Sequence, residues 1–273
     1  DLHRRRHSFP TRRSSDLIFI TLNEAPRLPA ALEAVKWADE IIVVDSGSTD
    51  DTVAIAQSYG ARVVVTDWPG FGAQKNRALD LATCPWVLSL DADEVLSADL
   101  QQEIQSFLQT DPPFHGATLP RLSSFCGRTI HHAGWWPDPV LRLFRRTLAR
   151  FSDDRVHERV IVDGPIHAFK GVLHHESYRD LAQVLSKVNQ YSSEGAQNHL
   201  QKGRRGGLGR ALAHGFWAFF RTYVIRLGLL EGREGFILAV SNAEGTYYRY
   251  LKLMYLQEAQ ARAQALSENA TGR

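Results

Sequence analysis

The chain has 273 residues, of which 44% are hydrophobic and 23% are charged. This composition excludes a largely disordered protein and suits one large domain, or one domain with an appendage. The two cysteines, Cys84 and Cys126, match no metal-binding or redox spacing. A disulfide framework is therefore not expected, and a reducing cytoplasm fits the sequence best.

The first sixteen residues, Asp1 to Asp16, differ from the rest of the chain. They contain five arginines and no core-forming periodicity, and the part from His7 onward resembles the translation of a common sequencing adapter. We therefore expect this segment to be non-native; a basic targeting arm is the alternative, but the apolar stretch of a signal peptide is missing. Without the segment, the formal net charge changes from +2 to −1. The nominal basicity thus gives no reason to expect nucleic acid as a partner.

Four apolar runs in the first hundred residues have the composition of buried strands: 17–22, 40–45, 62–66 and 86–90. The segments between them have helical patterns, expected at 28–37, 52–59 and 73–82. Continuous apolar strands that alternate with helices indicate a parallel sheet covered on both faces. Sheets of this kind bind their ligands at the carboxyl ends of the strands.

The fourth predicted strand ends in two carboxylates one residue apart, Asp91 and Asp93. This pair suits Mg²⁺ or Mn²⁺, which take oxygen ligands and can bridge a diphosphate, although a solvated turn would have the same sequence. Asp45 ends the second strand, and Lys75 lies in the first turns of the helix expected at 73–82. A cation at a helix amino end is unfavourable unless an anion lies nearby. We therefore expect these side chains to meet at one edge of the sheet.

Four segments, in this order and spacing, resemble glycosyltransferase family 2, the inverting enzymes of GT-A fold: 21–24, 45–52, 72–78 and 90–93. The resemblance implies an α/β, Rossmann-like fold with a mostly parallel central sheet covered by helices. It also implies that a nucleotide-sugar is bound by six residues: Thr21, Asn23, Glu24, Asp45, Lys75 and Asp91. Asp93 would be the direct metal ligand, and Asp91 would reach either the ribose or the metal.

Residues 109–178 are less regular, as expected of an acceptor-binding half. Trp135 and Trp136 are adjacent in a predicted loop. Indoles stack on the apolar faces of sugars, so the pair is a candidate acceptor site, with a plug for the core as the alternative. Eight arginines against four acidic residues between positions 121 and 159 would serve a phosphorylated ligand, although a solvated face is the usual explanation.

Inverting transfer needs a carboxylate that removes the proton of the acceptor hydroxyl. We expect Glu158 to be this base, because residues 156–158 resemble a Val-His-Glu segment of the family's lipopolysaccharide-core members. Asp153 and Asp154 are the competing candidates, and a surface salt bridge is the alternative role for Glu158. GT-A enzymes often supply a histidine as a further metal ligand. His174 or His175, expected in a turn after a strand at 168–173, would suit this role unless they are merely solvated.

The last part of the chain, 179–273, has the pattern of a helical appendage, with helices expected at 180–200, 211–230 and 235–253 and a frayed tail from 259. The segment 211–230 is long enough to span a bilayer, but charged residues interrupt it. Its large apolar residues share one side of a helical wheel: Leu212, Phe216, Phe219, Phe220, Tyr223, Leu227 and Leu230. With seven cations and one acid in 202–233, this pattern predicts a helix in the interface of an anionic leaflet. Packing on the catalytic domain is the alternative.

The leading hypothesis is a cytoplasmic glycosyltransferase, peripheral on the inner face of the cytoplasmic membrane, that uses Mg²⁺ or Mn²⁺. The resemblance implies UDP-glucose as the nucleotide-sugar donor and the lipopolysaccharide inner core, or another glycolipid, as acceptor. Within the family, the chain most resembles the lipopolysaccharide core β-1,4-glucosyltransferases. Two further hypotheses are sugar transfer to a polyprenyl phosphate and a non-catalytic nucleotide-sugar-binding module. A dehydrogenase is disfavoured, because no glycine fingerprint follows a strand.

Overall fold

The structure is a computed structural model that describes residues 14–152 and 159–271, with side chains as far as residue 266. The chain divides into two compact units. The first, here called the sheet unit, comprises the chain up to Arg121 together with Asp138–His175. The second, the helical unit, comprises Leu122–Pro137 and the chain from Glu176 onward. The segment 122–137 thus belongs with the helices, although it is distant from them in the chain.

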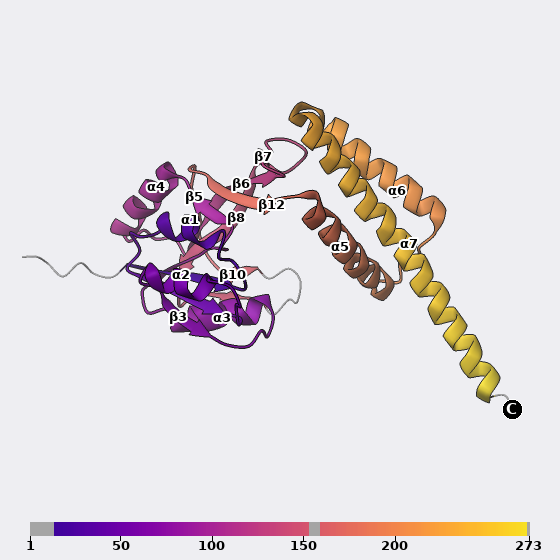
Figure 1. Ribbon diagram of the computed structural model, residues 1–273, viewed down its shortest axis with the longest axis horizontal. Coiled ribbons are helices and arrows are strands. Elements are labelled where there is room, and N and C mark those ends of the chain that lie inside the picture. Colours follow the sequence, from indigo (N-terminus) through magenta and orange to yellow (C-terminus); the bar gives the residue numbers. More distant parts are fainter. Residues whose placement is uncertain (1–13, 153–158, 272–273) are drawn as a thin grey trace, which may run out of the picture. The chain divides into compact units, whose positions relative to one another are not determined.

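The amino-terminal half of the sheet is parallel, as the sequence predicts. Its strands are β1 (Ser15–Thr21), β2 (Glu40–Asp45), β3 (Arg62–Val65) and β4 (Trp86–Ser89). They lie in the order β3-β2-β1-β4, and every pairing among them is parallel. The helices that connect them are α1 (Leu28–Glu33), α2 (Thr52–Ser58) and α3 (Phe71–Leu81) (Figure 1). The first four strand ends therefore share one edge.

Alternate residues of β1, β2 and β4 enter different cores, which explains why these strands are apolar throughout. Leu17 and Phe19 of β1 pack under α1, α2 and α4 (Ala98–Gln109), whereas Ile18 packs on the opposite face under α3. β1 begins at Ser15, inside the segment that the sequence set apart. The buried carboxylate of Asp16 accepts hydrogen bonds from the backbone N–H groups of Thr83 and Cys84, at 2.5 and 2.7 Å.

The second half of the sheet is mixed and adds strands in the order β4-β8-β6-β12-β5. Their bounds are β5 (Glu94–Leu96), β6 (Gly116–Phe125), β8 (Asp138–Arg145) and β12 (Leu173–Tyr178). β7 (Arg128–Thr129) and β11 (Ile166–Ala168) pair with β6, while β9 (Ala149–Phe151) and β10 (Val160–Val162) form a separate pair. The sheet is therefore parallel where the donor motifs lie and mostly antiparallel beyond them. Together with the covering helices it has the expected GT-A architecture.

One predicted strand is wrong. Residues 168–173 do not form a single strand, because β11 ends at Ala168 and β12 begins at Leu173. Gly171 lies in the turn between them, where a Cβ atom would come within 2.5 Å of the Leu100 Cα. The four residues 169–172 thus belong to neither strand. His174 and His175 consequently lie inside β12, not in a turn after a strand.

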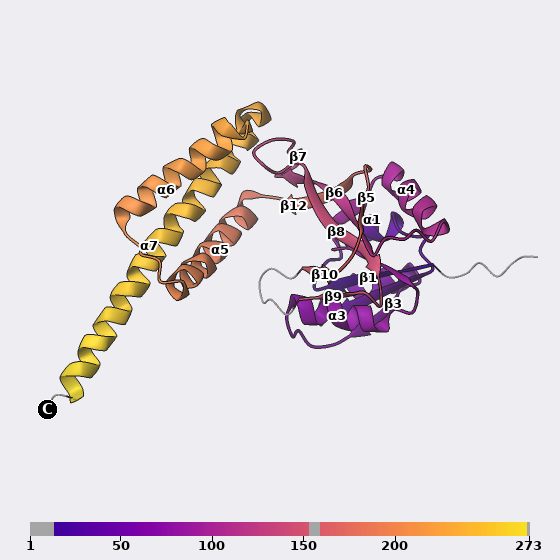
Figure 2. The same ribbon diagram turned by 180° about the vertical axis from the view of Figure 1, so that it is seen from behind.

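The helical unit contains α5 (Leu181–Gln201), α6 (Leu208–Phe220) and α7 (Gly232–Thr271). Figures 1 and 2 show α5 and α6 lying along α7, and each of these two helices contacts α7. The expected helix 211–230 is broken: α6 ends at Phe220 and is followed by a π-helical turn, η1 (Arg221–Ile225), and a 3₁₀ turn, η2 (Gly228–Glu231). Leu227 between them is left-handed, with φ 58°. α7 in turn runs far beyond the expected end at 253.

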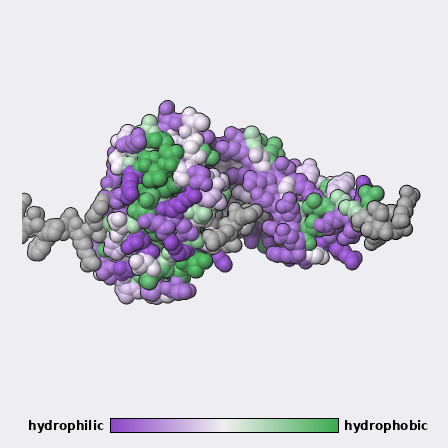
Figure 3. All heavy atoms as spheres, turned by 90° about the horizontal axis from the view of Figure 1, so that it is seen from below, coloured by the Kyte–Doolittle hydropathy of each residue, from purple (hydrophilic) through white to green (hydrophobic). Residues whose placement is uncertain are grey.

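Most of the large apolar side chains of α6 are exposed, although Phe219 contacts Phe236 of α7, with 5.7 Å between ring centroids. α6 packs on α7 through the small residues Ala211, Gly215 and Ala218. Its exposed side, here called the apolar surface, comprises Leu208, Leu212, Phe216, Trp217, Phe220 and Ile225 of the following turn. Figure 3 shows another face, on which polar residues prevail over the helical unit. Across the described ranges, no helix is both long and apolar enough to cross a bilayer.

Candidate active site

The loop after β2 is organised by Asp45, which is fully buried at the end of that strand. Its carboxylate accepts hydrogen bonds from the Thr21 hydroxyl at 2.7 Å and from the backbone N–H groups of Gly47 and Ser48 at 3.0 and 2.7 Å. The Ser48 hydroxyl donates a fourth, at 2.6 Å. Gly47 has φ 89°, which favours glycine. Both oxygens of Asp45 are thus used within the protein, and its direct effect is to fix this loop.

Asn23 and Glu24 join the loop after β1 to the loop after β2. The Asn23 side-chain oxygen accepts a hydrogen bond from the backbone N–H of Thr49 at 2.8 Å, and the backbone N–H of Asn23 donates to the Ser48 hydroxyl at 2.8 Å. The Glu24 backbone N–H donates to the Thr52 hydroxyl at 2.8 Å, and the Glu24 carboxylate accepts two hydrogen bonds from Arg27, at 2.7 and 2.8 Å. The first two motifs of the sequence therefore form one hydrogen-bonded platform at the edge of the sheet.

Lys75 and Arg142 hold Asp91 from two sides. The Lys75 ammonium, 3% exposed, lies 3.0 Å from Asp91 Oδ1, and Arg142 Nη2 lies 2.6 Å from Oδ2. Burial alone would raise the pKa of the Asp91 carboxyl, but Arg142 and Lys75 outweigh it and hold that pKa well below its usual range. Asp91 is therefore the anion expected beside Lys75, and it is ionised. Its side chain remains 34% exposed at the edge of the sheet.

Arg142 was not singled out by the sequence, although it lies in the arginine-rich stretch. It projects from β8 and also contacts Glu94, with Nη2 2.5 Å from Oε1 of a fully buried carboxylate. Arg121 approaches the same Glu94 oxygen at 3.4 Å and pairs with Asp138 at 2.7 Å. Burial lowers the pKa of Arg142, but Asp91 and Glu94 raise it above its usual value. These arginines are internal and do not form a solvated face.

Asp93 lies beside His175 and Arg27. Its Oδ2 atom is 3.6 Å from His175 Nε2 and 3.4 Å from Arg27 Nη1. The antiparallel pairing of β12 with β5 places His175 opposite Glu94, next to Asp93 in the chain. His174 is exposed and, as the next residue of a strand, faces the other side of the sheet. Of the two candidate histidines, the structure brings only His175 to Asp93.

The ligand types available at Asp93 suit a hard or borderline divalent cation. It offers a carboxylate and an imidazole, and both side chains are partly exposed. Within the described ranges, no cluster of three or more His, Cys, Asp or Glu side chains could hold a metal ion. An ion at Asp93 would thus need further oxygen ligands from substrate or water, as Mg²⁺ commonly does.

The remaining predicted residues lie elsewhere. Trp135 belongs to the helical unit and packs edge-on against Phe125, with Tyr178 also 6.0 Å away between ring centroids. It is thus part of a small core, the alternative that the sequence left open, while Trp136 faces His131 at 6.5 Å. The base candidates Asp153, Asp154 and Glu158 lie outside the described residues.

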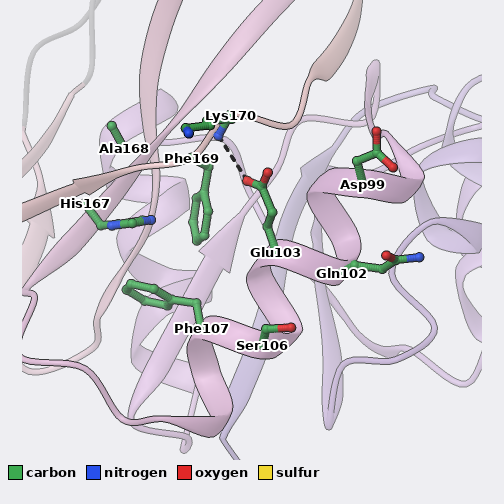
Figure 4. A pocket seen from close by; sticks show the side chains of 9 residues that line it. All are labelled: Asp99, Gln102, Glu103, Ser106, Phe107, His167, Ala168, Phe169 and Lys170. Carbon is green, nitrogen blue, oxygen red and sulfur yellow. Dashed lines mark hydrogen bonds between the residues drawn. The ribbon is translucent and has the colours of Figure 1, made fainter.

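A separate cavity of about 570 Å³ lies between α4 and the segment 167–170. Figure 4 shows Phe107, His167 and Phe169 on one side of it and Glu103 on the other, where Glu103 accepts the backbone N–H of Lys170 at 3.0 Å. None of the predicted donor or metal residues lines this cavity.

Comparison with known proteins gives consistent matches. The family profile described as Glycosyl transferase family 2 matches residues 16–160. An uncharacterized glycosyltransferase of Rickettsia felis is 33% identical over 256 residues, which cover 88% of each chain. The lipopolysaccharide core biosynthesis glycosyltransferase LpsC of Rhizobium meliloti is 30% identical over 89% of this chain and 93% of its own. A structure of glucosyl-3-phosphoglycerate synthase from Mycobacterium tuberculosis, in complex with Mn²⁺, UDP and glucosyl-3-phosphoglycerate, has a TM-score of 0.38 at 22% identity, covering 50% of this chain and 60% of that one.

Proposed function

Because this chain belongs to glycosyl transferase family 2 and is a glycosyltransferase, we propose that it transfers a hexose, glucose, from UDP-glucose to the lipopolysaccharide inner core. The single observation that carries the donor site is the convergence of Asp91 and Asp93 with three cations, Lys75, Arg142 and Arg27. Acids and cations at the carboxyl ends of parallel strands suit an activated sugar diphosphate. The name of the Rhizobium meliloti relative supports the acceptor.

In the proposed donor complex, the platform made by Thr21, Asn23, Glu24 and Asp45 holds the nucleotide. Asp45 acts through the loop that it fixes, so the contacts to the base or ribose fall to groups exposed on that loop. Lys75 orients Asp91, which reaches the ribose or the metal. Arg27 adds positive charge beside Asp93, where the diphosphate would lie.

We propose Asp93 as the direct ligand of Mg²⁺ or Mn²⁺, with His175 as a second ligand and Asp91 as a further candidate. Such an ion, when bound, neutralises the charge that develops on the diphosphate leaving group. His174 is not proposed as a ligand, since it lies on the other face of β12.

Glu158 is proposed to take the proton of the acceptor hydroxyl, with Asp153 and Asp154 as competitors. The acceptor oxygen then forms a bond to the anomeric carbon, while the bond from that carbon to the diphosphate breaks and its electron pair leaves with the phosphate. Because the attack comes from the side opposite the leaving group, the anomeric configuration inverts. Trp136 is the proposed acceptor contact, and Trp135 supports the loop that carries it.

We further propose that the enzyme works in the cytoplasm on the inner face of the cytoplasmic membrane. The apolar surface of α6 supports this proposal, because large side chains such as Phe216 and Trp217 are exposed where small ones make the helix contact. Arg204, Arg205 and Arg210 are exposed close by in the chain. A basic helix with an apolar side suits an anionic leaflet, where a lipid-linked acceptor is found.

The proposal is tested by incubating the purified enzyme with radiolabelled UDP-sugars and isolated inner-core acceptor. We expect transfer from UDP-glucose, with a smaller rate from UDP-galactose. Glu158→Gln should lower transfer by about 100-fold or more, because general base catalysis is lost. Asp163→Asn is the matched control, since that side chain is exposed on the sheet unit. Full transfer by Glu158→Gln would refute the proposal that Glu158 is the base. Absence of transfer from every UDP-sugar would refute the proposal that the donor is a UDP-sugar.

A further inference from the structure

Another cavity, of about 370 Å³ and lined mainly by polar residues, lies within the helical unit. Residues of α6, η1, α7 and the loop before Pro137 line it, and three of them are arginines: Arg221, Arg226 and Arg249. No acidic residue is among the lining residues. The other polar side chains there are Thr222, Asn242 and Thr246. The volume falls in the usual range for ligand sites, and the wall is strongly cationic.

The three guanidinium groups have no carboxylate partner within the described part of the chain. The Nε atom of Arg249 is buried without any hydrogen-bond partner. A buried donor that is left unpaired costs free energy, and a charged one costs more. That Nε atom faces Gly195 of α5, which does not line the cavity, so an anion in the cavity would be bound by the other nitrogens of the guanidinium groups.

Two of the arginines pack closely on glycines. The Arg226 side chain lies on Gly134, where a Cβ atom would come within 2.4 Å of Nη1. The Arg249 side chain lies on Gly195 of α5, where a Cβ atom would come within 2.6 Å of Nε. The Arg226 carbonyl also accepts the backbone N–H of Ala133 at 2.7 Å. A side chain at either glycine would displace the arginine that packs on it, so the space for these two guanidinium groups depends on the glycines.

The chemistry of the site selects a phosphate group. Guanidinium groups bind phosphate through paired hydrogen bonds, and several of them can share its oxygens. The same stretch of chain also carries apolar residues, since Phe220 precedes Arg221 and Ile225 precedes Arg226, and both apolar side chains are exposed. A ligand with a phosphate beside a hydrocarbon region matches this combination.

We propose that the cavity binds the phosphate monoester of a membrane-lipid headgroup and so fixes the helical unit on the leaflet. This inference rests on the proposed membrane association and adds a specific lipid contact to it. It assigns Arg221, Arg226 and Arg249 a role apart from sugar transfer.

The test compares binding of the full chain to two kinds of phosphatidylcholine vesicle in co-sedimentation. One contains phosphatidic acid, a monoester, and the other contains phosphatidylglycerol, a diester, at matched surface charge. We expect the chain to bind the monoester vesicles about tenfold more tightly, because charge-assisted hydrogen bonds to the exposed phosphate are added. The Arg226→Gln/Arg249→Gln double variant should lose this preference but still bind both vesicles.

Arg210→Gln/Arg262→Gln is the control, because it removes the same charge from exposed positions of α6 and α7. It should keep the preference for phosphatidic acid. Gly195→Ala is a second variant that leaves every charge in place and favours the α5 helix, but displaces Arg249. It should weaken the preference as well.

Glycerol 3-phosphate, titrated in a calorimeter, separates a free phosphate from a lipid. Binding of this probe by the wild-type chain without any preference for phosphatidic acid vesicles would overturn the lipid assignment. Equal preference in the wild-type chain and in Arg226→Gln/Arg249→Gln would overturn the site itself. If the wild-type chain binds neither kind of vesicle, the result would instead contradict the membrane association on which the inference rests.

Discussion

Two groups of arginines, one in each unit, differ in what they face. In the sheet unit, Arg142 is nearly buried and contacts the carboxylates of Asp91 and Glu94. In the helical unit, Arg226 and Arg249 line a cavity without an acidic residue. The first arrangement fixes the protein's own acids at the edge of the sheet, whereas the second leaves cations available to an external anion. The same residue type thus serves internal organisation in one unit and recognition in the other.

The largest effect on stability is expected from Arg142→Met, which breaks the internal arrangement. Removal of Arg142 leaves the fully buried Glu94 with only the longer contact to Arg121, at 3.4 Å, in place of the ion pair at 2.5 Å. We expect the free energy of unfolding of the sheet unit to fall by about 3–5 kcal/mol in urea titrations.

Arg150→Met is the matched control, since Arg150 pairs with Asp80 and both side chains are well exposed. Its cost should stay below about 1 kcal/mol, the usual size for surface pairs. Equal costs for the two variants would show that the buried network does not hold the sheet unit together.

The pH dependence of stability gives a second test of the ion pairs that Arg142 and Lys75 make with Asp91 in the sheet unit. Because Arg142 and Lys75 hold the pKa of Asp91 below its ordinary value of 3.8, the folded state binds this proton less readily than the unfolded state. The resulting stabilisation is present above that ordinary value and is lost as the pH falls through the lower, folded-state pKa. The free energy of unfolding should therefore fall more steeply below about pH 4 in the wild type than in Asp91→Asn. Parallel curves would contradict this assignment.

The smallest effect on stability is expected at the apolar surface. Phe216 is 71% exposed, so Phe216→Ser should change the free energy of unfolding by less than about 0.5 kcal/mol. It should nevertheless weaken binding to anionic vesicles, because an exposed aromatic residue enters the interface of the bilayer. Leu266→Ser, at an equally exposed position of α7, is the control and should leave vesicle binding unchanged. A loss of stability in Phe216→Ser would mean that this side chain packs within the protein.

The sequence predicted the parallel half of the sheet well, because its signals are local. The strands ending near Asp45 and Asp91 are continuous apolar runs, and turn-forming residues follow them. The expectation that Lys75 needs a nearby anion is confirmed by its contact with Asp91. Each of these inferences depends only on residues adjacent in the chain and on the rule that parallel strands end at one edge.

Other features of the site depend on pairing between distant segments. His175 reaches Asp93 because β12 pairs antiparallel with β5, a neighbour that no local pattern indicates. Arg142 could not be distinguished from the nearby arginines until β8 was placed beside β4. The break after Phe220 was also missed, since the left-handed Leu227 belongs to a residue type that seldom adopts that conformation.

The proposed metal and donor site at Asp93 is tested most directly by UDP binding with and without Mn²⁺, measured by calorimetry on the wild type, Asp93→Asn and Asp163→Asn. We predict that Mn²⁺ strengthens UDP binding by about tenfold or more in the wild type and in Asp163→Asn, and that this gain is lost in Asp93→Asn. The same gain in all three proteins would show that Asp93 does not hold the ion, and would contradict the site proposed at the edge of the sheet.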